Sequence, residues 1–349
     1  MSDFELESAS LPQSSLSDDL PPVQPPSAGF IVQLFLFPAL IVMGVIAIWW
    51  MFGLIAAGEQ DWRKLLQDLQ SQNLMVRNRA MYGLAQVLDQ DSRRGEQGQN
   101  LRNNREIARG LADQLSIELK KNSNSRDNVA IQEYLARALG MMDSLDAITP
   151  ALQMALEPQR DVDIRKSAVV SLSFIAGRAK ERGEPLSDAA IIDSLIQLSA
   201  DPLPILRQSS AFALGLFQSP EAIHQLEVLL ENSDPMTAVN AAIGLARSGS
   251  TKGFPVLRDS LITPAAVDTK AANATAATEA SGDQFRVAKN VLKAVNELAP
   301  KFDLSQRDEL MPLVEELASK HPEIRIRVDA EAALNSLKLA AKTVTPAAP

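Results

Sequence analysis

The 349-residue chain contains no cysteine and only two histidines, His224 and His321. Without cysteine there are no disulfide bonds, thiolate zinc sites or cysteine nucleophiles. The histidines form no His-x-x-x-His or His-Glu pair, because they are followed by Gln225 and Pro322. We therefore expect no histidine-based metal site.

Short motifs of catalysis and nucleotide binding are also missing. The chain has no Gly-x-x-x-x-Gly-Lys-Ser/Thr, Gly-x-Gly-x-x-Gly or Gly-x-Ser-x-Gly sequence. The cradles that hold phosphates and the tight turn that presents a hydrolase serine depend on those glycines. Neighbouring carboxylates such as Glu315 and Glu316 have the character of a solvated helix face. We therefore expect neither an enzyme nor a bound cofactor.

Basic residues are absent from the first part of the chain. All 34 Lys and Arg residues follow residue 57, whereas residues 1–28 contain 5 of the 43 acidic residues. The remainder has 43 minus 5, or 38, acidic residues against 34 basic ones, a net charge near −4. Because nucleic-acid binding needs basic surfaces that neutralise phosphates, we expect no nucleic-acid partner.

A run of 29 residues without a charge extends over 29–57. A helix rises about 1.5 Å per residue, so this run exceeds the roughly 30 Å hydrocarbon core of a bilayer and predicts a transmembrane helix. A secretory signal peptide fits less well, because no basic segment precedes the run and the run is too long. Residues 1–28, rich in Ser, Pro and acidic side chains, predict a disordered tail.

The charges around this run predict its orientation. Basic residues follow it closely, beginning with Arg63 and Lys64, and none precedes it. The positive-inside rule then places the tail outside and the rest of the chain in the cytoplasm. We expect a single-pass protein of the cell (inner) membrane.

The rest of the chain repeats a helical phrase. Apolar or small residues recur at steps 0, +4, +7 and +8, mostly with arginine at +1, which places them on one face of an α-helix. The residues at step 0 are Val76, Ile131, Ile164, Leu206, Thr237, Val287 and Ile326. Such repetition predicts stacked helical hairpins rather than one globule.

Capping residues mark several helix starts. An Asp or Ser N-cap followed by Pro satisfies free amide groups and presets the first helical dihedral. Three such pairs are Asp201-Pro202, Ser219-Pro220 and Asp234-Pro235. They predict helices that begin near 202, 220 and 235. The spacing of Asp303 and Gln306 predicts a capping box.

The phrase and its spacing resemble HEAT repeats, in the short form also found in phycobilin-lyase-like proteins, over residues 59–342. The resemblance implies an all-α fold, an α-solenoid of about seven helical hairpins after the single transmembrane helix. Loop insertions are expected near 91–104 and 263–283, where the copies are farthest apart. Residues 343–349 are expected to be a disordered tail.

The resemblance also implies a role for the arginines at step +1, which in HEAT repeats commonly bond between neighbouring hairpins. This structural ladder consists of Arg77, Arg165, Arg207 and Arg327. Nearby carboxylates that would supply partners are Asp161, Asp163 and Asp201. The alternative is that the guanidinium groups grip an acidic peptide.

Steps +2 and +6 lie opposite the core face, and in HEAT-type stacks that face tends to line the concave side. The candidate groove residues on these steps are Tyr82, Glu133, Arg137, Lys166, Gln208, Phe212 and Ile243. Aromatic and branched residues in a line, rimmed by mixed charge, suit an amphipathic helix or an extended peptide. The alternative is that curvature buries them between adjacent helices.

We therefore expect a membrane-anchored, non-catalytic scaffold that binds a protein partner through the concave face of the solenoid. The alternative is a protein similar to bilin lyases, which would hold a tetrapyrrole or another small amphipathic ligand on the same face. The absence of cysteine does not exclude this alternative, because lyase-like action does not strictly need an enzyme thiol.

Overall fold

The computed structural model describes residues 28–56, 61–121, 125–262 and 274–344. In these residues all regular structure is helical, with 15 α-helices and two 3₁₀ helices, as the predicted all-α fold requires. Met1–Glu59 and Gln60–Pro349 are separate units. The tail predicted at 1–28 lies almost wholly outside the described residues.

The first unit contains one apolar helix, α1 (Ala28–Ala56). Its segment Val32–Met51, 20 residues with a mean hydropathy of 2.4, is long and apolar enough to cross a membrane, and none of it is buried in the protein. A helix that is apolar on all sides has no polar face to turn toward water. By length and composition, a membrane span and an N-terminal signal sequence both meet this description.

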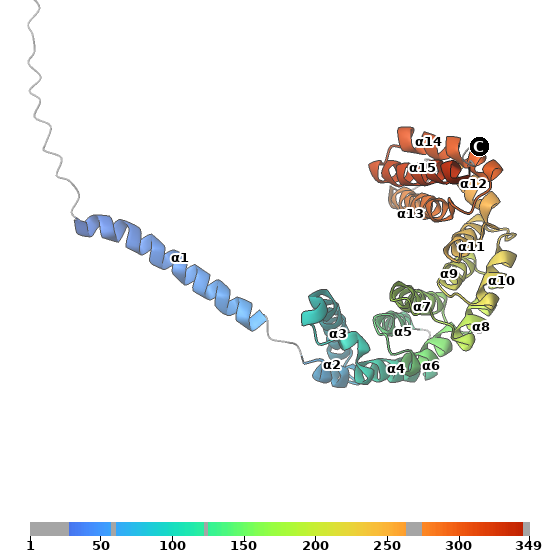
Figure 1. Ribbon diagram of the computed structural model, residues 1–349. Helices are drawn as coiled ribbons and strands as arrows, with labels where there is room; N and C mark the ends of the chain where they lie inside the picture. Colours follow the sequence, from blue (N-terminus) through green and yellow to red (C-terminus); the bar gives the residue numbers. More distant parts are fainter. Residues whose placement is uncertain (1–27, 57–60, 122–124, 263–273, 345–349) are drawn as a thin grey trace, which may run out of the picture. The chain divides into compact units, whose positions relative to one another are not determined.

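The described part of the second unit consists of seven helical hairpins, each with an outer helix followed by an inner one (Figure 1). The outer helices are α2 (Trp62–Leu69), α4 (Arg105–Lys120), α6 (Leu145–Leu156), α8 (Ala189–Leu198), α10 (Pro220–Leu229), α12 (Phe254–Ile262) and α14 (Leu304–Lys320). The inner helices are α3 (Leu74–Arg94), α5 (Arg126–Leu139), α7 (Val162–Glu181), α9 (Pro204–Leu214), α11 (Pro235–Arg247), α13 (Ala274–Leu298) and α15 (Ile324–Val344).

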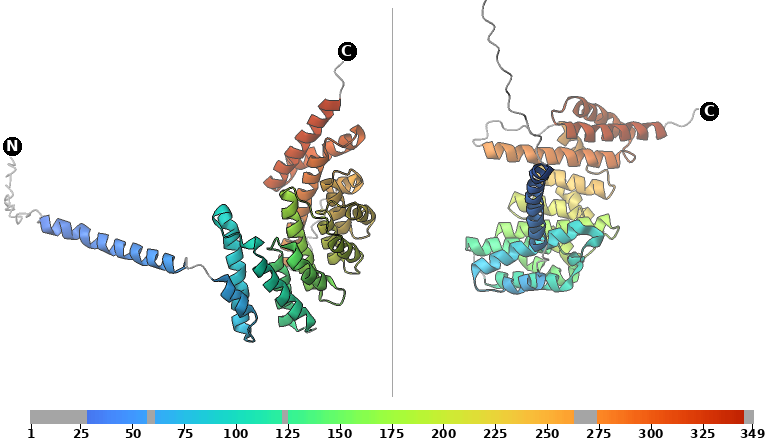
Figure 2. Two further views of the ribbon diagram at one scale, coloured as in Figure 1. Left: turned by 60° about the horizontal axis from the view of Figure 1, so that its bottom comes forward. Right: turned by 90° about the vertical axis from the view of Figure 1, so that its left-hand side faces the viewer.

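Each inner helix contacts the inner helix of the next hairpin, so the hairpins stack in chain order into an α-solenoid (Figure 2). Within this unit the inner helices lie on the concave side of the curve in Figure 1. Helices with one apolar stripe can bury it only against neighbours, and stacking provides a neighbour on each side. The predicted solenoid is confirmed.

A continuous apolar core lies between the outer and inner layers. The step 0 residues that it buries are Ile131, Ile164, Leu206, Thr237 and Ile326. Two others differ: Val287 is half-buried against the core, and Val76, in the first turn of α3, is 37% exposed. The two halves of the core meet at α11, where Ala241 packs toward the earlier hairpins and Ala242 toward the later ones.

Three of the predicted helix starts are confirmed. The side chains of Ser219 and Asp234 accept amide hydrogens at the starts of α10 and α11, which begin at Pro220 and Pro235. The capping box Asp303–Gln306 at the start of α14 is formed in both directions. Local chemistry therefore sets these boundaries.

The start predicted near residue 202 is wrong, because α9 begins at Pro204. The residue before a proline is disfavoured in the helical region, so Leu203 stays extended and the helix cannot start earlier. Asp201 holds the preceding turn instead. Its Oδ1 accepts the amide hydrogen of Leu203 (2.9 Å), and its Oδ2 accepts from Arg165 (2.5 Å).

The segment predicted as a loop insertion near 91–104 is partly helical. After α3 ends at Arg94, two short 3₁₀ helices follow, η1 (Gly95–Gln97) and η2 (Leu101–Asn103). The buried carboxylate of Asp91 holds them, accepting amide hydrogens from Gln99 (2.5 Å) and Leu101 (2.6 Å). The insertion is an ordered connection rather than an irregular loop.

The second predicted insertion is shorter than expected. Helix α13 begins at Ala274, so the loop predicted over 263–283 extends no further than residue 273. Residues 263–273 lie outside the described residues. Likewise α15 continues to Val344, and the rest of the tail predicted at 343–349 lies outside the described residues.

Consecutive inner helices approach each other closely where side chains are small. A Cβ atom on Gly215, at the end of α9, would lie 2.5 Å from the Cα of Gly244 in α11. A Cβ on Gly140, at the end of α5, would lie 2.8 Å from the Cα of Ser171 in α7. In both pairs step +9 of one phrase meets step +7 of the next. The small residues at steps +7 and +9 therefore set the distance between consecutive inner helices, in addition to the apolar face that the repeated phrase provides.

We predict that Gly215→Ala destabilises the chain by about 1–3 kcal/mol, because the new methyl group forces α9 and α11 apart. Thermal unfolding of the full chain in detergent, followed by circular dichroism, measures the change. The matched control is Gly177→Ala in α7, where a Cβ would meet nothing within 4 Å. This control should be stabilised by about 0.5–1 kcal/mol through helix propensity. Equal melting temperatures for the two variants would refute the close-approach argument.

Candidate interaction site on the inner helices

An open hollow of ≈ 540 Å³ lies on the inner face of the solenoid between α7 and α9, and it reaches α11. Its lining residues are Val169, Val170, Ser173, Phe174, Gly177, Arg178, Glu181, Ile205, Gln208, Ser209, Phe212 and Asn240. We call this the α7–α9 hollow. Helix α9 has 11 residues and α7 has 20, so α7 extends past the end of its neighbour.

The apolar part of the α7–α9 hollow is unusually open to solvent. Phe174 is 61% exposed and Ile205 is 39% exposed, while Val170 and Phe212 are half-buried beside them. A single exposed apolar residue is ordinary on a protein surface, whereas adjacent ones with an aromatic member are typical of binding sites. Burial of these side chains by a ligand would be favourable in proportion to the apolar area covered.

The polar groups of the hollow hold neighbouring hairpins together. Gln208 Nε2 donates to Asp234 Oδ2 (3.0 Å), and Asn240 Nδ2 donates to the backbone oxygen of Gln208 (3.0 Å). Arg178 is fully engaged, because it donates to Asp143 Oδ1 (2.7 Å) and to the backbone oxygen of Gly140 (2.9 Å). These bonds link α7 to the preceding hairpin and α9 to α11.

Two cations lie where α7 and α11 meet beyond the short α9. Lys180 Nζ donates to the backbone oxygen of Arg247 (3.3 Å), and the Arg247 guanidinium lies over the ring of Phe212, with 4.9 Å between Cζ and the ring centroid. Burial lowers the pKa of Lys180, and the charge of Arg247 lowers it further. Burial also lowers the pKa of Arg247, against the opposing attraction of Glu297. The two cations are therefore neighbours of Phe212, while the acidic residue that lines the hollow is Glu181.

The structure brings two of the seven predicted groove residues, Gln208 and Phe212, into the α7–α9 hollow. Elsewhere on the inner helices, Tyr82 of α3 is 71% exposed and Lys166 of α7 is exposed. Tyr82 packs edge-to-face against Tyr134, with the ring centroids 6.3 Å apart. Neither Tyr82 nor Lys166 lines the hollow.

The remaining predicted groove residues belong to α5 and α11. Glu133 and Arg137 of α5 form an ion pair along their own helix (2.9 Å). The prediction for Ile243 was wrong, because this side chain is 4% exposed and lies in the core. Its face of α11 is covered by α13, which packs directly against α11. At this position the alternative of burial between adjacent inner helices holds.

Sequence reasoning missed Phe174, the most exposed apolar residue of the hollow. It lies at step +10 of the third phrase, four residues beyond the +6 position of Val170, so it continues the same helix stripe. Extending the +2 and +6 rows by one more turn would have found it. Arg247 lies at the same step +10 of the fifth phrase.

The ladder arginines bond within the protein in two ways. Arg77 Nη1 donates to Glu118 Oε1 of the next hairpin (3.1 Å), and Arg165 Nη2 donates to Asp201 Oδ2 of the next hairpin (2.5 Å). Arg207 and Arg327 instead donate to backbone oxygens in the turn before their own helix. The acceptors are the oxygens of Asp201 (2.9 Å), Pro202 (3.0 Å), His321 (2.7 Å) and Pro322 (3.2 Å).

Two of the acidic partners proposed for this ladder have another role. Asp161 is the N-cap of α7 and accepts the amide hydrogen of Asp163, so it does not pair with Arg165. Asp163 is exposed in the first turn of α7, where its negative charge interacts favourably with the positive end of the helix dipole. Only Asp201 among the three binds ladder arginines.

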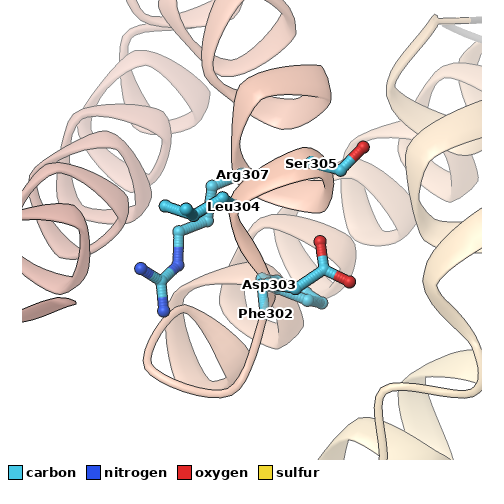
Figure 3. Close-up of a pocket in the computed structure, with 5 residues that line it drawn as sticks. All are labelled: Phe302, Asp303, Leu304, Ser305 and Arg307. Atoms are coloured by element: carbon cyan, nitrogen blue, oxygen red, sulfur yellow. The ribbon is translucent and has the colours of Figure 1, made fainter.

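A second recess, of ≈ 470 Å³, lies at the turn into α14 (Figure 3). Its polar groups are occupied by the fold itself. Asp303 accepts the amide hydrogen of Gln306 (2.8 Å), and Arg307 extends away from Asp303 and donates to the backbone oxygen of Ala340 (2.8 Å). Among the described residues no group of three or more His, Asp or Glu side chains is placed to hold a metal ion.

Comparison with known proteins agrees with the fold. Residues 192–277, which include α9 to α12, match the family model for HEAT repeats. No curated protein matches the chain. Over this range the chain is therefore similar to HEAT repeats, and the neighbouring hairpins repeat the same helical arrangement.

Several solved structures are similar to this chain at low sequence identity. The complex of CpcE and CpcF of phycocyanin lyase from a Nostoc species has 17% identity over 80% of this chain and 96% of that chain, with a TM-score of 0.43. A designed armadillo repeat protein in complex with the peptide (KR)4 has 14% identity over 80% of this chain and 100% of that chain (TM-score 0.37). Kap95p, in a structure with RanGDP, has 12% identity over 85% of this chain and 39% of that chain (TM-score 0.44).

We predict that Arg165→Ala destabilises the chain by about 3–5 kcal/mol, because it leaves the carboxylate of Asp201 buried without its partner. Both side chains of this pair are only 8% exposed. Arg137→Ala is the matched control, since its pair with Glu133 is exposed and worth less than about 1 kcal/mol. Thermal unfolding compares the two. A loss no larger than that of the control would show that the ladder is not structural.

Proposed function

We propose that this chain is a membrane-anchored scaffold without catalytic activity of its own, and that it docks a segment of a protein partner in the α7–α9 hollow. The observation that carries the proposal is the apolar cluster that lines the hollow, in which Phe174 and Ile205 are exposed and Val170 and Phe212 are half-buried. Aromatic anchors in a recess, surrounded by polar groups, are typical of peptide-docking surfaces.

The shape of the hollow favours a peptide over an enclosed small molecule. It is a partly open site between the neighbouring inner helices α7 and α9, so an elongated ligand can lie along the helices and remain partly in solvent. Three of its polar side chains, Gln208, Asn240 and Arg178, are engaged in structural hydrogen bonds.

We predict that Phe174→Asp abolishes partner binding without unfolding the chain, because Phe174 is exposed and its replacement places a charge where the partner would bury an apolar group. In-cell crosslinking of the full-length protein, followed by identification of the captured proteins, measures the loss. A photo-reactive amino acid at position 174 should label the same partner directly.

The matched control for this experiment is Ile117→Asp, which replaces a similarly exposed apolar residue (49%) on the outer helix α4. It should retain the partner. If both variants capture the same proteins as wild type, the hollow is not the docking site. If the purified protein instead carries a visible absorbance band, the small-ligand alternative replaces the scaffold.

The anchoring part of the proposal is supported by Val32–Met51, which has about the length that a helix needs to span the hydrocarbon core. Trp49 and Trp50 lie near its end, where aromatic residues favour the bilayer interface. The absence of basic residues before the helix supports a solenoid in the cytoplasm and a tail outside.

We predict that the full chain resists extraction from membranes by alkaline carbonate and that deletion of residues 29–57 releases the solenoid as a soluble protein. An epitope tag placed before residue 1 should remain on the membrane-bound form. Loss of that tag by cleavage would identify a signal sequence instead. A reporter that works only in the cytoplasm should be active when it is fused after residue 349. Activity there of a reporter that works only outside the cytoplasm would show the opposite orientation.

A further inference from the structure

Arg247 differs from the other arginines that pack into the solenoid. Among the wholly or partly buried arginines of the described residues, it alone makes no hydrogen bond or ion pair through its side chain, and its buried Nη1 has no partner. An unpaired buried donor lowers stability, so such groups are normally satisfied. Arg178, by contrast, binds a carboxylate and two backbone oxygens.

The surroundings of Arg247 supply positive charge but no bound carboxylate. Lys180 of α7 donates to the backbone oxygen of Arg247, so its ammonium group lies at the end of the same helix. Glu297 of α13 attracts Arg247, but its carboxylate is paired with Lys293 on its own helix (3.9 Å). Two cations from different hairpins thus converge, and Glu297 attracts both without forming a hydrogen bond to Arg247.

The position of Arg247 is coupled to the α7–α9 hollow. Its guanidinium lies over the ring of Phe212, and Phe212 lines the hollow. A Cβ on Gly215 would lie 3.3 Å from Arg247 Nη1, so this glycine leaves room for the guanidinium. A ligand that covers Phe212 therefore lies one side chain away from Arg247.

We infer that Arg247, assisted by Lys180, is a carboxylate-binding site that selects partner segments in which an Asp or Glu lies next to an aromatic or bulky aliphatic residue. This inference rests on the proposed docking function and states which chemistry the partner carries. The bulky residue packs on Phe174 and Phe212, and the carboxylate accepts hydrogen bonds from the unpaired guanidinium. Charge complementarity with the two cations excludes basic segments from the same place.

The acidic tail of the same chain is not the occupant under this proposal. Residues 1–28 contain acidic residues and Phe4, but the proposed membrane span separates them from the solenoid. The ligand is therefore a segment of another protein on the side of the membrane that holds the repeats.

The test is selection of peptides from a random display library on the full-length protein in detergent micelles. Wild type should enrich peptides with an acidic residue beside a bulky apolar one. Arg247→Gln should retain the apolar preference and lose the acidic one. The matched control is Arg137→Gln, which changes an ion-paired arginine on the same face and should select as wild type does.

A double-mutant cycle on one selected peptide measures the interaction itself. Replacing its acid by the amide should weaken binding to wild type roughly 10- to 100-fold, the range for a charge-assisted hydrogen bond. The same replacement should have little effect with Arg247→Gln, and an intermediate effect with Lys180→Gln. The peptide change needs no protein variant, so the test stands even if Arg247→Gln unfolds.

The outcomes separate this inference from the docking function. Peptides that lack acids, or whose amide forms bind wild type equally well, would overturn the role of Arg247 and leave docking in place, provided that Phe174→Asp abolishes their binding. Peptides whose binding survives Phe174→Asp would overturn the docking function itself. So would a failure of wild type to select any peptide.

Discussion

The inner face of this solenoid depends on how closely consecutive inner helices approach one another. At Gly215 and Gly244 a single added methyl group would overlap the facing backbone, and Gly140 meets Ser171 in the same way. Close packing of this kind fixes the position of each inner helix relative to the next, because protein interiors resist small changes in volume. It also brings Phe212 of one hairpin under Arg247 of the next. The candidate site is therefore a consequence of helix packing and needs no separate loop to build it.

Apolar burial and polar contacts have different roles in the stack. The leucine, isoleucine and alanine residues between the two layers supply most of the free energy of folding, since burial of apolar area is the dominant favourable term. Buried charge pairs such as Arg165 with Asp201 add little net stability compared with apolar replacements. A buried charge pair does make an incorrect offset between two hairpins unfavourable, because a shifted hairpin leaves one of the two charges unpaired. The pairs thus make the order and offset of the hairpins specific.

The sequence predicts the solenoid well because helix periodicity and capping are local signals. Helices α10, α11 and α14 begin where their caps indicate. The start of α9 was mispredicted because a second proline two residues later overrides the first. The burial of Ile243 depends on α13, which lies far along the chain, so no local pattern reveals it. The hollow was missed in part for the same reason, since its depth reflects the unequal lengths of adjacent helices.

Two residues of this site, Phe174 and Arg247, lie at step +10 of the repeated phrase. Helix α9 ends at step +8, whereas α7 continues past step +10 and α11 ends at step +10. Phe174 and Arg247 therefore have no counterpart on α9 itself, and Lys180 of α7 donates to the backbone oxygen of Arg247 at the end of α11. The packing steps of the phrase hold the helices together, so residues beyond them can vary without loss of the fold. In this part of the stack α9 ends before both of its neighbours, so residues near the ends of α7 and α11 can contribute to the candidate site without disturbing the packing steps.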